Sequence, residues 1–382
     1  MIGLPPFLSF SENERILQLK TLMIILRTVK NISSLNIAAS VLLFLAAILA
    51  AVVANSSLSP VYQDFLLQEL HLRIGNFNLF SHGGHPLKMI EFINDCLMTV
   101  FFLAVGLEIK RELLVGELSS VRKAALPFIA ACGGMVVPVV IYALSVASGT
   151  PETRGMAIPM ATDIAFSLGV LSLLGKRVPL SLKIFLTAFA VVDDIGGILV
   201  IALFYSADVA YGYLIAAAVL YVFLYYMGKF GVTQKIFFLF FGVIIWYLFL
   251  QSGIHSTISG VILAFVIPAR PRLDAGKYIE RIRDIIGEFP VSKSDNIVLT
   301  NAQIATLKQV ERASDYVISP LQSLEDNLHG AVSFVILPLF AFANAGVVFS
   351  GSGSIVGDVS IAVAAGLLLG KFLGYTCLRG WR

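Results

Sequence analysis

Charge is scarce in this sequence of 382 residues. Asp, Glu, Lys and Arg fill 13% of the positions, hydrophobic residues fill 58%, and the mean hydropathy is +0.88. Soluble domains carry about 25% charge, and a water-soluble fold of this size could not bury so much apolar surface. The composition therefore excludes an ordinary soluble domain and predicts an all-α polytopic membrane protein, because a helix satisfies its own backbone polar groups in lipid.

Cysteine and recognisable catalytic patterns are also scarce. The three cysteines, Cys96, Cys132 and Cys377, lie in or beside apolar runs, and an odd count gives no disulfide framework. The net charge of +3 is too small to indicate a nucleic-acid partner. The sequence has no nucleotide-binding loop, zinc-ligand spacing or Ser-His-Asp pattern, so we expect no cofactor.

Apolar runs of helical length recur along the chain. A helix of about 20 residues crosses the hydrocarbon core of a bilayer, and the first run, Leu35 to Ala54, is longer than the core of a signal peptide. We interpret it as a retained helix and find no cleavable signal. The sequence predicts about ten transmembrane helices, at roughly 35–55, 90–108, 124–147, 156–174, 184–204, 211–228, 236–251, 255–268, 329–349 and 359–378.

The positions of Lys and Arg predict the orientation. With residues 1–34 as a cytoplasmic N-terminal segment, 23 of the 27 Lys and Arg residues fall in inner segments. Only Arg73, Lys88 and Arg154 fall in outer ones. By the positive-inside rule we expect a cytoplasmic N-terminus, with residues 35–382 as one transmembrane domain.

Two segments of this domain are predicted to lie outside the lipid. The alternation in Leu70–Ile74, followed by Gly75-Asn76, predicts a small hairpin in an outer loop at 56–89. Residues 270–327 form a polar cytoplasmic insertion. Within it Tyr278, Ile282 and Ile285 recur at helical spacing and predict an amphipathic helix.

Ionisable residues inside the predicted spans are functional hypotheses, because each costs several kcal/mol in lipid unless it has a partner or water. Asp193 and Asp194 are adjacent in the middle of a span, and helical neighbours point about 100° apart. Burial and mutual repulsion favour a proton on at least one of the two carboxyl groups. A site that exchanges a cation for protons needs this property.

Two further spans carry unexpected groups. Pro159 precedes Thr162 and Asp163, and a proline inside a span frees backbone groups that can act as oxygen ligands. This predicts a discontinuous helix near Thr162-Asp163 and a sodium or lithium site. Lys371, in the last span, is either a counter-ion to Asp193 or Asp163, or itself a proton carrier.

Other titratable residues lie at span edges. Asp95, near an outer edge, is either a charge on the ion access route or a satisfied polar cap. Glu108, Arg111 and Glu112 share a helix face by spacing, and are either a functional cluster or an exposed salt-bridged helix end. His255 and His329 each open a predicted span, where a histidine has either a regulatory role or a merely polar one.

Together these motifs resemble the NhaA family of sodium/proton antiporters. The stretches that carry the resemblance run in family order: Phe92–Phe102, Gly106–Glu112, Ala157–Ala165, Lys183–Leu186, Val191–Gly196, Ser252–Gly260, Ile336–Gly346 and Gly366–Gly374.

The resemblance implies a fold of inverted repeats and a role for each matching residue. Asp163 and Asp194 would bind the transported cation beside Thr162, and Asp193 would pair with Lys371. A pH-responsive region would include Glu108, Arg111, Glu112, His255, Glu325 and His329. It further implies electrogenic exchange of Na⁺ or Li⁺ for H⁺ by alternating access, and a homodimer through the outer loop 56–89.

The chain departs from the family pattern in two ways. The family normally has twelve spans, and this chain stops just after the tenth predicted one, so its second repeat is expected to be incomplete. The 270–327 insertion is also longer than the loop expected there. Two alternatives stay open: a truncated homologue that does not transport, and an intramembrane aspartyl protease using Asp163 with Asp193 or Asp194. Such proteases carry a GxGD pattern, which is missing before Asp194.

Overall fold

The computed structural model describes most of the chain. The described residues are 38–71, 73–74, 77–78, 80–82, 85–146, 151–160, 178–204, 209–271, 275–287, 300–349 and 357–377. The predicted N-terminal segment 1–34 lies outside them, as do Thr162 and Asp163.

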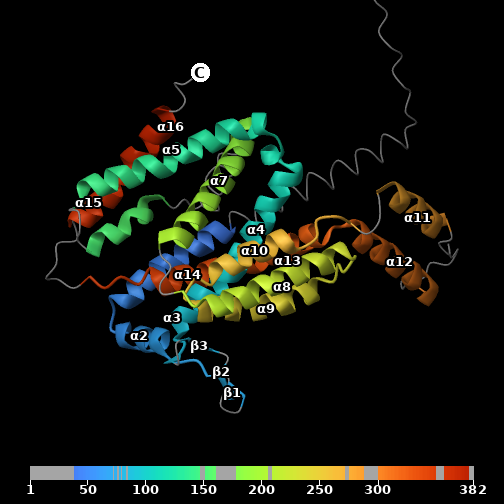
Figure 1. Cartoon of the computed structure of the whole chain (residues 1–382), viewed down its shortest axis with the longest axis horizontal. Helices are drawn as coiled ribbons and strands as arrows, with labels where there is room; N and C mark the ends of the chain where they lie inside the picture. Colours follow the sequence, from blue (N-terminus) through green and yellow to red (C-terminus); the bar gives the residue numbers. More distant parts are fainter. Residues whose placement is uncertain are drawn as a thin grey trace, which may run out of the picture.

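The described residues are almost entirely helical (Figure 1). The first part holds the helix Ala38–Ala54, α2 (Ser59–Leu67), α3 (Met89–Phe92), the π-helix η1 (Ile93–Leu97), α4 (Met98–Val115), the 3₁₀ helix η2 (Glu117–Ser119), α5 (Val121–Ser145), the 3₁₀ helix η3 (Pro151–Met160) and α7 (Leu180–Phe204). The second part holds α8 (Tyr211–Lys229), α9 (Lys235–Ser252), α10 (Thr257–Val266), α11 (Ala275–Gly287), α12 (Asn301–Val317), α13 (Pro320–Ala331), the π-helix η5 (Val332–Ile336), α14 (Leu337–Asn344), α15 (Asp358–Ala365), the π-helix η6 (Gly366–Gly370) and α16 (Lys371–Cys377).

Five stretches among the described residues are long and apolar enough to cross a membrane: Met89–Val115, Ala124–Ser145, Tyr211–Lys229, Lys235–Ser252 and Pro320–Asn344. The helix Ala38–Ala54 and α2 make a sixth candidate if the pair, bent by 112°, is one broken span. Large apolar side chains project outward from these helices, Leu144 and Ile236 most of all, as a lipid-facing surface requires.

The boundaries of several helices differ from the sequence prediction, and two of these differences matter for the site. The stretch Pro320–Asn344 begins ahead of the predicted 329, so the end of the 270–327 segment belongs to this helix and Glu325 lies on it. Within the predicted 255–268, α10 has only ten residues. At about 1.5 Å per residue it reaches half-way across a bilayer.

One group of helices packs around α4. Its apolar core joins side chains of α4, α8, α9, α10 and α13, with Leu107, Leu224, Phe238, Ile245 and Ile267 fully buried. In lipid the hydrophobic effect does not drive helices together, and close packing at small residues takes its place. A methyl group added at Gly106 of α4 would lie 2.8 Å from Ala264 Cβ of α10, so these two backbones are in near contact.

A second group packs around α5. It includes α7, η3, α15, η6 and α16, and Figure 1 shows α15 and α16 alongside α5. Gly366, Gly370 and Gly374 recur every fourth residue and therefore lie on one helix face, which meets α5 at Gly133 and Pro138. The α7 residues Ala188–Val192 pack between α4 and α5 and connect the two groups.

The segment before α3 carries the hairpin that the sequence predicts, and a second one. Strand β1 (Arg73–Ile74) pairs antiparallel with β2 (Phe77–Asn78), and β3 (Ser81–His82) pairs with β4 (His85–Pro86). Buried Leu87 packs with Trp246 and Leu250 of α9, which holds this segment against the α4 group.

The amphipathic pattern at 278–286 forms helix α11, as predicted. It packs against α12, and the pair lies at the edge of the molecule beyond α13 (Figure 1).

Candidate functional site

Asp193 and Asp194 lie in the interior of α7, an apolar helix of 25 residues. Asp193 is buried, with 5% of its surface exposed, whereas Asp194 is only partly buried. The preceding residues Ala190, Val191 and Val192 are buried among side chains of α4 and α5. The two carboxylates therefore have unequal surroundings.

Lys371 starts α16 directly after the π-helix η6. Its ammonium group interacts electrostatically with the carboxylate of Asp193. A π-helical segment carries a wider turn than an α-helix and occurs often at functional sites. Because Gly370 lies against the α5 backbone, where an added methyl group would be 2.7 Å from Pro138 Cα, the glycine face sets how closely Lys371 approaches the α5 group. The structure thus places Lys371 within electrostatic reach of Asp193, and the counter-ion pair stays a prediction.

The predicted partners Thr162 and Asp163 lie outside the described residues, but the chain just before them does not. Pro159 is fully buried and lies against Gly366, where an added methyl group would be 2.9 Å from Pro159 Cβ. Met160 lies near Gly197 on α7. The described end of η3 therefore touches both the helix of Asp194 and the segment before Lys371.

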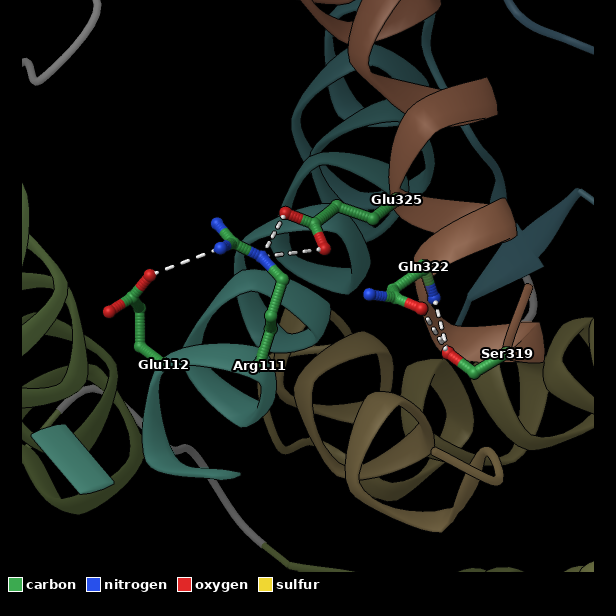
Figure 2. A network of polar contacts seen from close by, with 5 residues as sticks. All are labelled: Arg111, Glu112, Ser319, Gln322 and Glu325. Atoms are coloured by element: carbon green, nitrogen blue, oxygen red, sulfur yellow. Dashed lines mark hydrogen bonds and ion pairs between the residues drawn. The ribbon is translucent and has the colours of Figure 1, made fainter. Parts of the chain in front are cut away.

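A second cluster forms where α4 meets α13 (Figure 2). Arg111 donates through Nε to Glu325 Oε1 at 2.9 Å and to Oε2 at 3.1 Å. Its Nη1 lies 3.2 Å from Glu112 Oε1, and Glu112 is buried. Glu108, on the same helix, interacts electrostatically with Arg111 and Glu325. Ser319 caps α13 by accepting a hydrogen bond from the Gln322 backbone N–H at 3.2 Å.

His329 lies farther along α13 and is exposed. The structure therefore places Glu108, Arg111, Glu112 and Glu325 in one cluster and His329 on the same helix as Glu325. A guanidinium between carboxylates makes charge-assisted hydrogen bonds, the strongest kind available to side chains.

Asp95 and His255, which are distant in sequence, line one cavity of about 560 Å³. Its other lining residues include Glu69, His85, Lys88 and Glu91. Asp95 lies in η1, and the hydroxyl of buried Ser256 donates to its carbonyl oxygen and to its Oδ1, each at 3.3 Å. Trp246 Nε1 donates to the same carbonyl oxygen. Asp95 is thus held where α9 and the start of α10 meet the first long span.

Sequence reasoning missed several of these partners. Ser256 and Trp246, which hold Asp95, carry no charge, so they are not conspicuous in apolar segments. Asn94 and Asn344, which exchange side-chain hydrogen bonds at 2.8 and 3.3 Å, also went unnoticed. The available signal was the position of Ser256, immediately after His255 and immediately before α10.

The chain matches the model of the family described as Na⁺/H⁺ antiporter 1 over residues 30–380. It is 76% identical over 352 residues to the Na⁺/H⁺ antiporter NhaA of Bacteroides thetaiotaomicron, covering 92% of this chain and 80% of the relative. It is 61% identical to NhaA of Phocaeicola vulgatus, over 86% of this chain and 74% of the relative. It is also 46% identical to NhaA of Porphyromonas gingivalis, over 91% of this chain and 78% of the relative. With a match over nearly its whole length, the chain belongs to the Na⁺/H⁺ antiporter family named for NhaA.

Proposed function

We propose that this protein exchanges Na⁺ or Li⁺ for protons across the bacterial inner membrane. The observation that carries the proposal is the Asp193-Asp194 pair inside an apolar helix, with Lys371 of another helix interacting with Asp193. Membership of a family whose relatives are called Na⁺/H⁺ antiporters supports it.

The unequal surroundings of the two carboxylates suggest different roles. Lys371 offsets the charge of buried Asp193, which lets a charge persist where isolated charges are costly. In this proposal the Asp194 carboxylate takes either a cation or a proton. A carboxylate oxygen is a hard ligand that suits Na⁺ and Li⁺, and protonation removes its charge, so the two cargoes compete. Asp163 and Thr162 complete the cation site in this proposal.

Exchange then follows from alternating access. Sodium loads from the cytoplasm, is released outside, and the site returns with protons. If more protons than sodium ions move in each cycle, as the resemblance implies, transport is electrogenic. The cavity that Asp95 and His255 line would be on the outer access route.

The cluster at α4 and α13 is the proposed pH-responsive region. Glu108, Glu112, Glu325 and His329 can change charge, and Arg111 connects two of them across helices. Proton uptake by a carboxylate weakens its pairing with Arg111, so the junction between α4 and α13 loosens as the pH falls. His255 would act on the pH profile from the cavity.

The remaining parts of the proposal concern assembly. The bias of Lys and Arg supports a cytoplasmic N-terminus. The strands β1 to β4 lie at one end of the structure in Figure 1 and would form the contact of a homodimer.

The test is the sodium-induced collapse of an imposed proton gradient in inside-out vesicles that carry this chain. We expect a response to Na⁺ and Li⁺ that Asp194→Asn abolishes, because the amide can neither carry a proton nor offset a cation. Asp284→Asn, at an exposed position on α11, is the matched control and should behave as wild type. Normal exchange by Asp194→Asn would overturn the assignment of the site, and no response from inserted, stable wild type would overturn the function.

A further inference from the structure

The short helix α10 ends inside the protein, and a lysine of α4 covers that end. The last carbonyl groups of a helix have no partner within the helix and carry a partial negative charge. Lys110 Nζ donates to the carbonyl oxygens of Ala264 at 3.3 Å and Phe265 at 2.8 Å, and also to that of Ile267. An ammonium group has three N–H donors, so it can supply one to each of these three carbonyl groups.

Lys110 belongs to the face of α4 that meets α10. Thr99, Leu103, Gly106 and Lys110 follow one another at spacings of four, three and four, which places them on one helix face. Thr99 and Leu103 meet Gly260 of α10, and Gly106 meets Val261 and Ala264. Glycine contacts bring two backbones together without fixing how far one slides along the other. Polar contacts at both ends, from Ser256 to Asp95 and from Lys110 to Ile267, supply that fixed register.

The same contact continues into α13 and returns to α4. The carbonyl oxygen of Pro268, next to Ile267, accepts a hydrogen bond from the Leu321 backbone N–H at 3.3 Å. Leu321 is buried in the first turn of α13, one turn before Glu325, which pairs with Arg111. Adjacent residues on α4, Lys110 and Arg111, thus contact α10 and α13 respectively. The contacts form a closed ring of α4, the end of α10 and α13.

We propose that Lys110 is a positioning residue that sets the register of α10 against α4, and that the end of α10 in turn holds α13 so that Glu325 meets Arg111. The inference deepens the proposed function, because it makes the pH-responsive cluster depend on a lysine that touches none of its carboxylates in the contacts described. Lys110 touches no transported ion in this proposal.

Other charged groups face the ring and are part of the response. Glu108 and Glu112 lie on α4, and Asp326 and His329 on α13. From α9, Lys235 Nζ donates to Ser323 Oγ at 2.7 Å, two residues before Glu325 on α13. These groups stay in place when Lys110 is replaced. Lys110 can itself titrate, so Lys110→Arg, which keeps the charge without titrating, separates the loss of that titration from a change in the position of α13.

The experiment is a double-mutant cycle between Lys110→Met and Glu325→Gln in the full chain. Melting temperatures of the purified proteins in detergent form the first readout, which needs no transport. The apparent KM for Na⁺ and the pH of half-maximal exchange in vesicles form the second. Lys110→Arg is the conservative variant, and Lys308→Met, on the exposed side of α12, is the matched control.

We expect Lys110→Met to lower the melting temperature by several degrees, to raise the KM several-fold and to shift the pH profile. In the Glu325→Gln background Lys110→Met should change these three quantities much less, because the contact between Arg111 and Glu325 that Lys110 positions is already lost. Lys110→Arg should restore the wild-type pH profile, and Lys308→Met should match wild type throughout. If Lys110→Met cannot be recovered, Lys110→Gln replaces it in the same cycle.

Two results would overturn the inference. One is an additive cycle, in which Lys110→Met lowers the melting temperature as much in the Glu325→Gln protein as in wild type. Lys110 would then stabilise the protein independently of the Arg111–Glu325 contact. The other is a loss of melting temperature with an unchanged pH profile. Absence of exchange by the wild type would count against the proposed function alone, since the melting-temperature cycle would still test the position of α13.

Discussion

Arg111 on α4 and Glu325 on α13 are 214 positions apart in the sequence, and the guanidinium Nε donates to both carboxylate oxygens, at 2.9 and 3.1 Å. The same guanidinium also approaches Glu112 Oε1 at 3.2 Å (Figure 2). One cation therefore joins a carboxylate on its own helix to one on another. Because each carboxylate loses its charge when it takes up a proton, the strength of this junction depends on pH.

Glu325→Gln should weaken the junction while leaving the shape of the side chain unchanged. We expect a loss of about 1 kcal/mol of stability, since the pair is partly exposed and charge-assisted bonds of this kind contribute modestly. Exchange should continue with a displaced pH profile. Glu280→Gln, the same substitution at an exposed position on α11, is the control. A wild-type pH profile in Glu325→Gln would remove this pair from the pH response.

Much of this site was accessible from sequence because charge in an apolar run is conspicuous. Asp193, Asp194 and Lys371 stood out for that reason, as did Asp95. Partners were harder to predict. Nothing near Arg111 in the chain points to Glu325, and the acceptors of Lys110 are backbone carbonyl groups, which every residue has and which no sequence pattern marks.

The geometry of the helices was also only partly predictable. Apolar periodicity located α5, α8 and α9, but the π-helical segments at Ile93–Leu97, Val332–Ile336 and Gly366–Gly370 depend on packing. The same holds for the start of α13 at Pro320, where the capping Ser319 looks like an ordinary polar residue in a polar segment.

Gly370→Ala should disturb the site without altering any charge. The added methyl group would lie 2.7 Å from Pro138 Cα, and a backbone atom cannot move aside as the end of a side chain can. Overpacking of this kind costs about 1–3 kcal/mol. The added methyl group should push the start of α16 away from α5. Lys371, the first residue of α16, would then move away from Asp193. We expect exchange to fall more than tenfold.

The matched control for Gly370→Ala is Gly330→Ala. Gly330 lies inside α13, and an added methyl group there meets nothing within 4 Å. Alanine is a better helix former than glycine, so the free energy of unfolding of this variant should rise by about 0.5–1 kcal/mol. Equal behaviour of the two variants in thermal unfolding would contradict the proposed close approach of α16 to α5.

Ser256→Ala tests how Asp95 is held. The hydroxyl of Ser256 is buried and donates to Asp95 Oδ1 and to its carbonyl oxygen. Removing this hydroxyl should lower the free energy of unfolding by about 1 kcal/mol and let the Asp95 side chain turn within the cavity. We expect a raised apparent KM for Na⁺ with little change in maximal rate, measured in vesicles. Ser145→Ala, whose hydroxyl only bonds its own helix, is the control.

Asn94 and Asn344 connect the residue beside Asp95 to the end of α14. Each amide donates to the carbonyl oxygen of the other, at 3.3 and 2.8 Å, and Asn344 also donates to Phe340 within its own helix. Because the two amides satisfy each other, losing either one removes both bonds. Asn94→Ala and Asn344→Ala should each lower the melting temperature, and the double variant should fall no further than the more damaging single one. The coupling expected is about 0.5–1.5 kcal/mol. Additive losses would show that the amides contribute separately, and that η1 is held in place by Trp246 and Ser256 without help from α14.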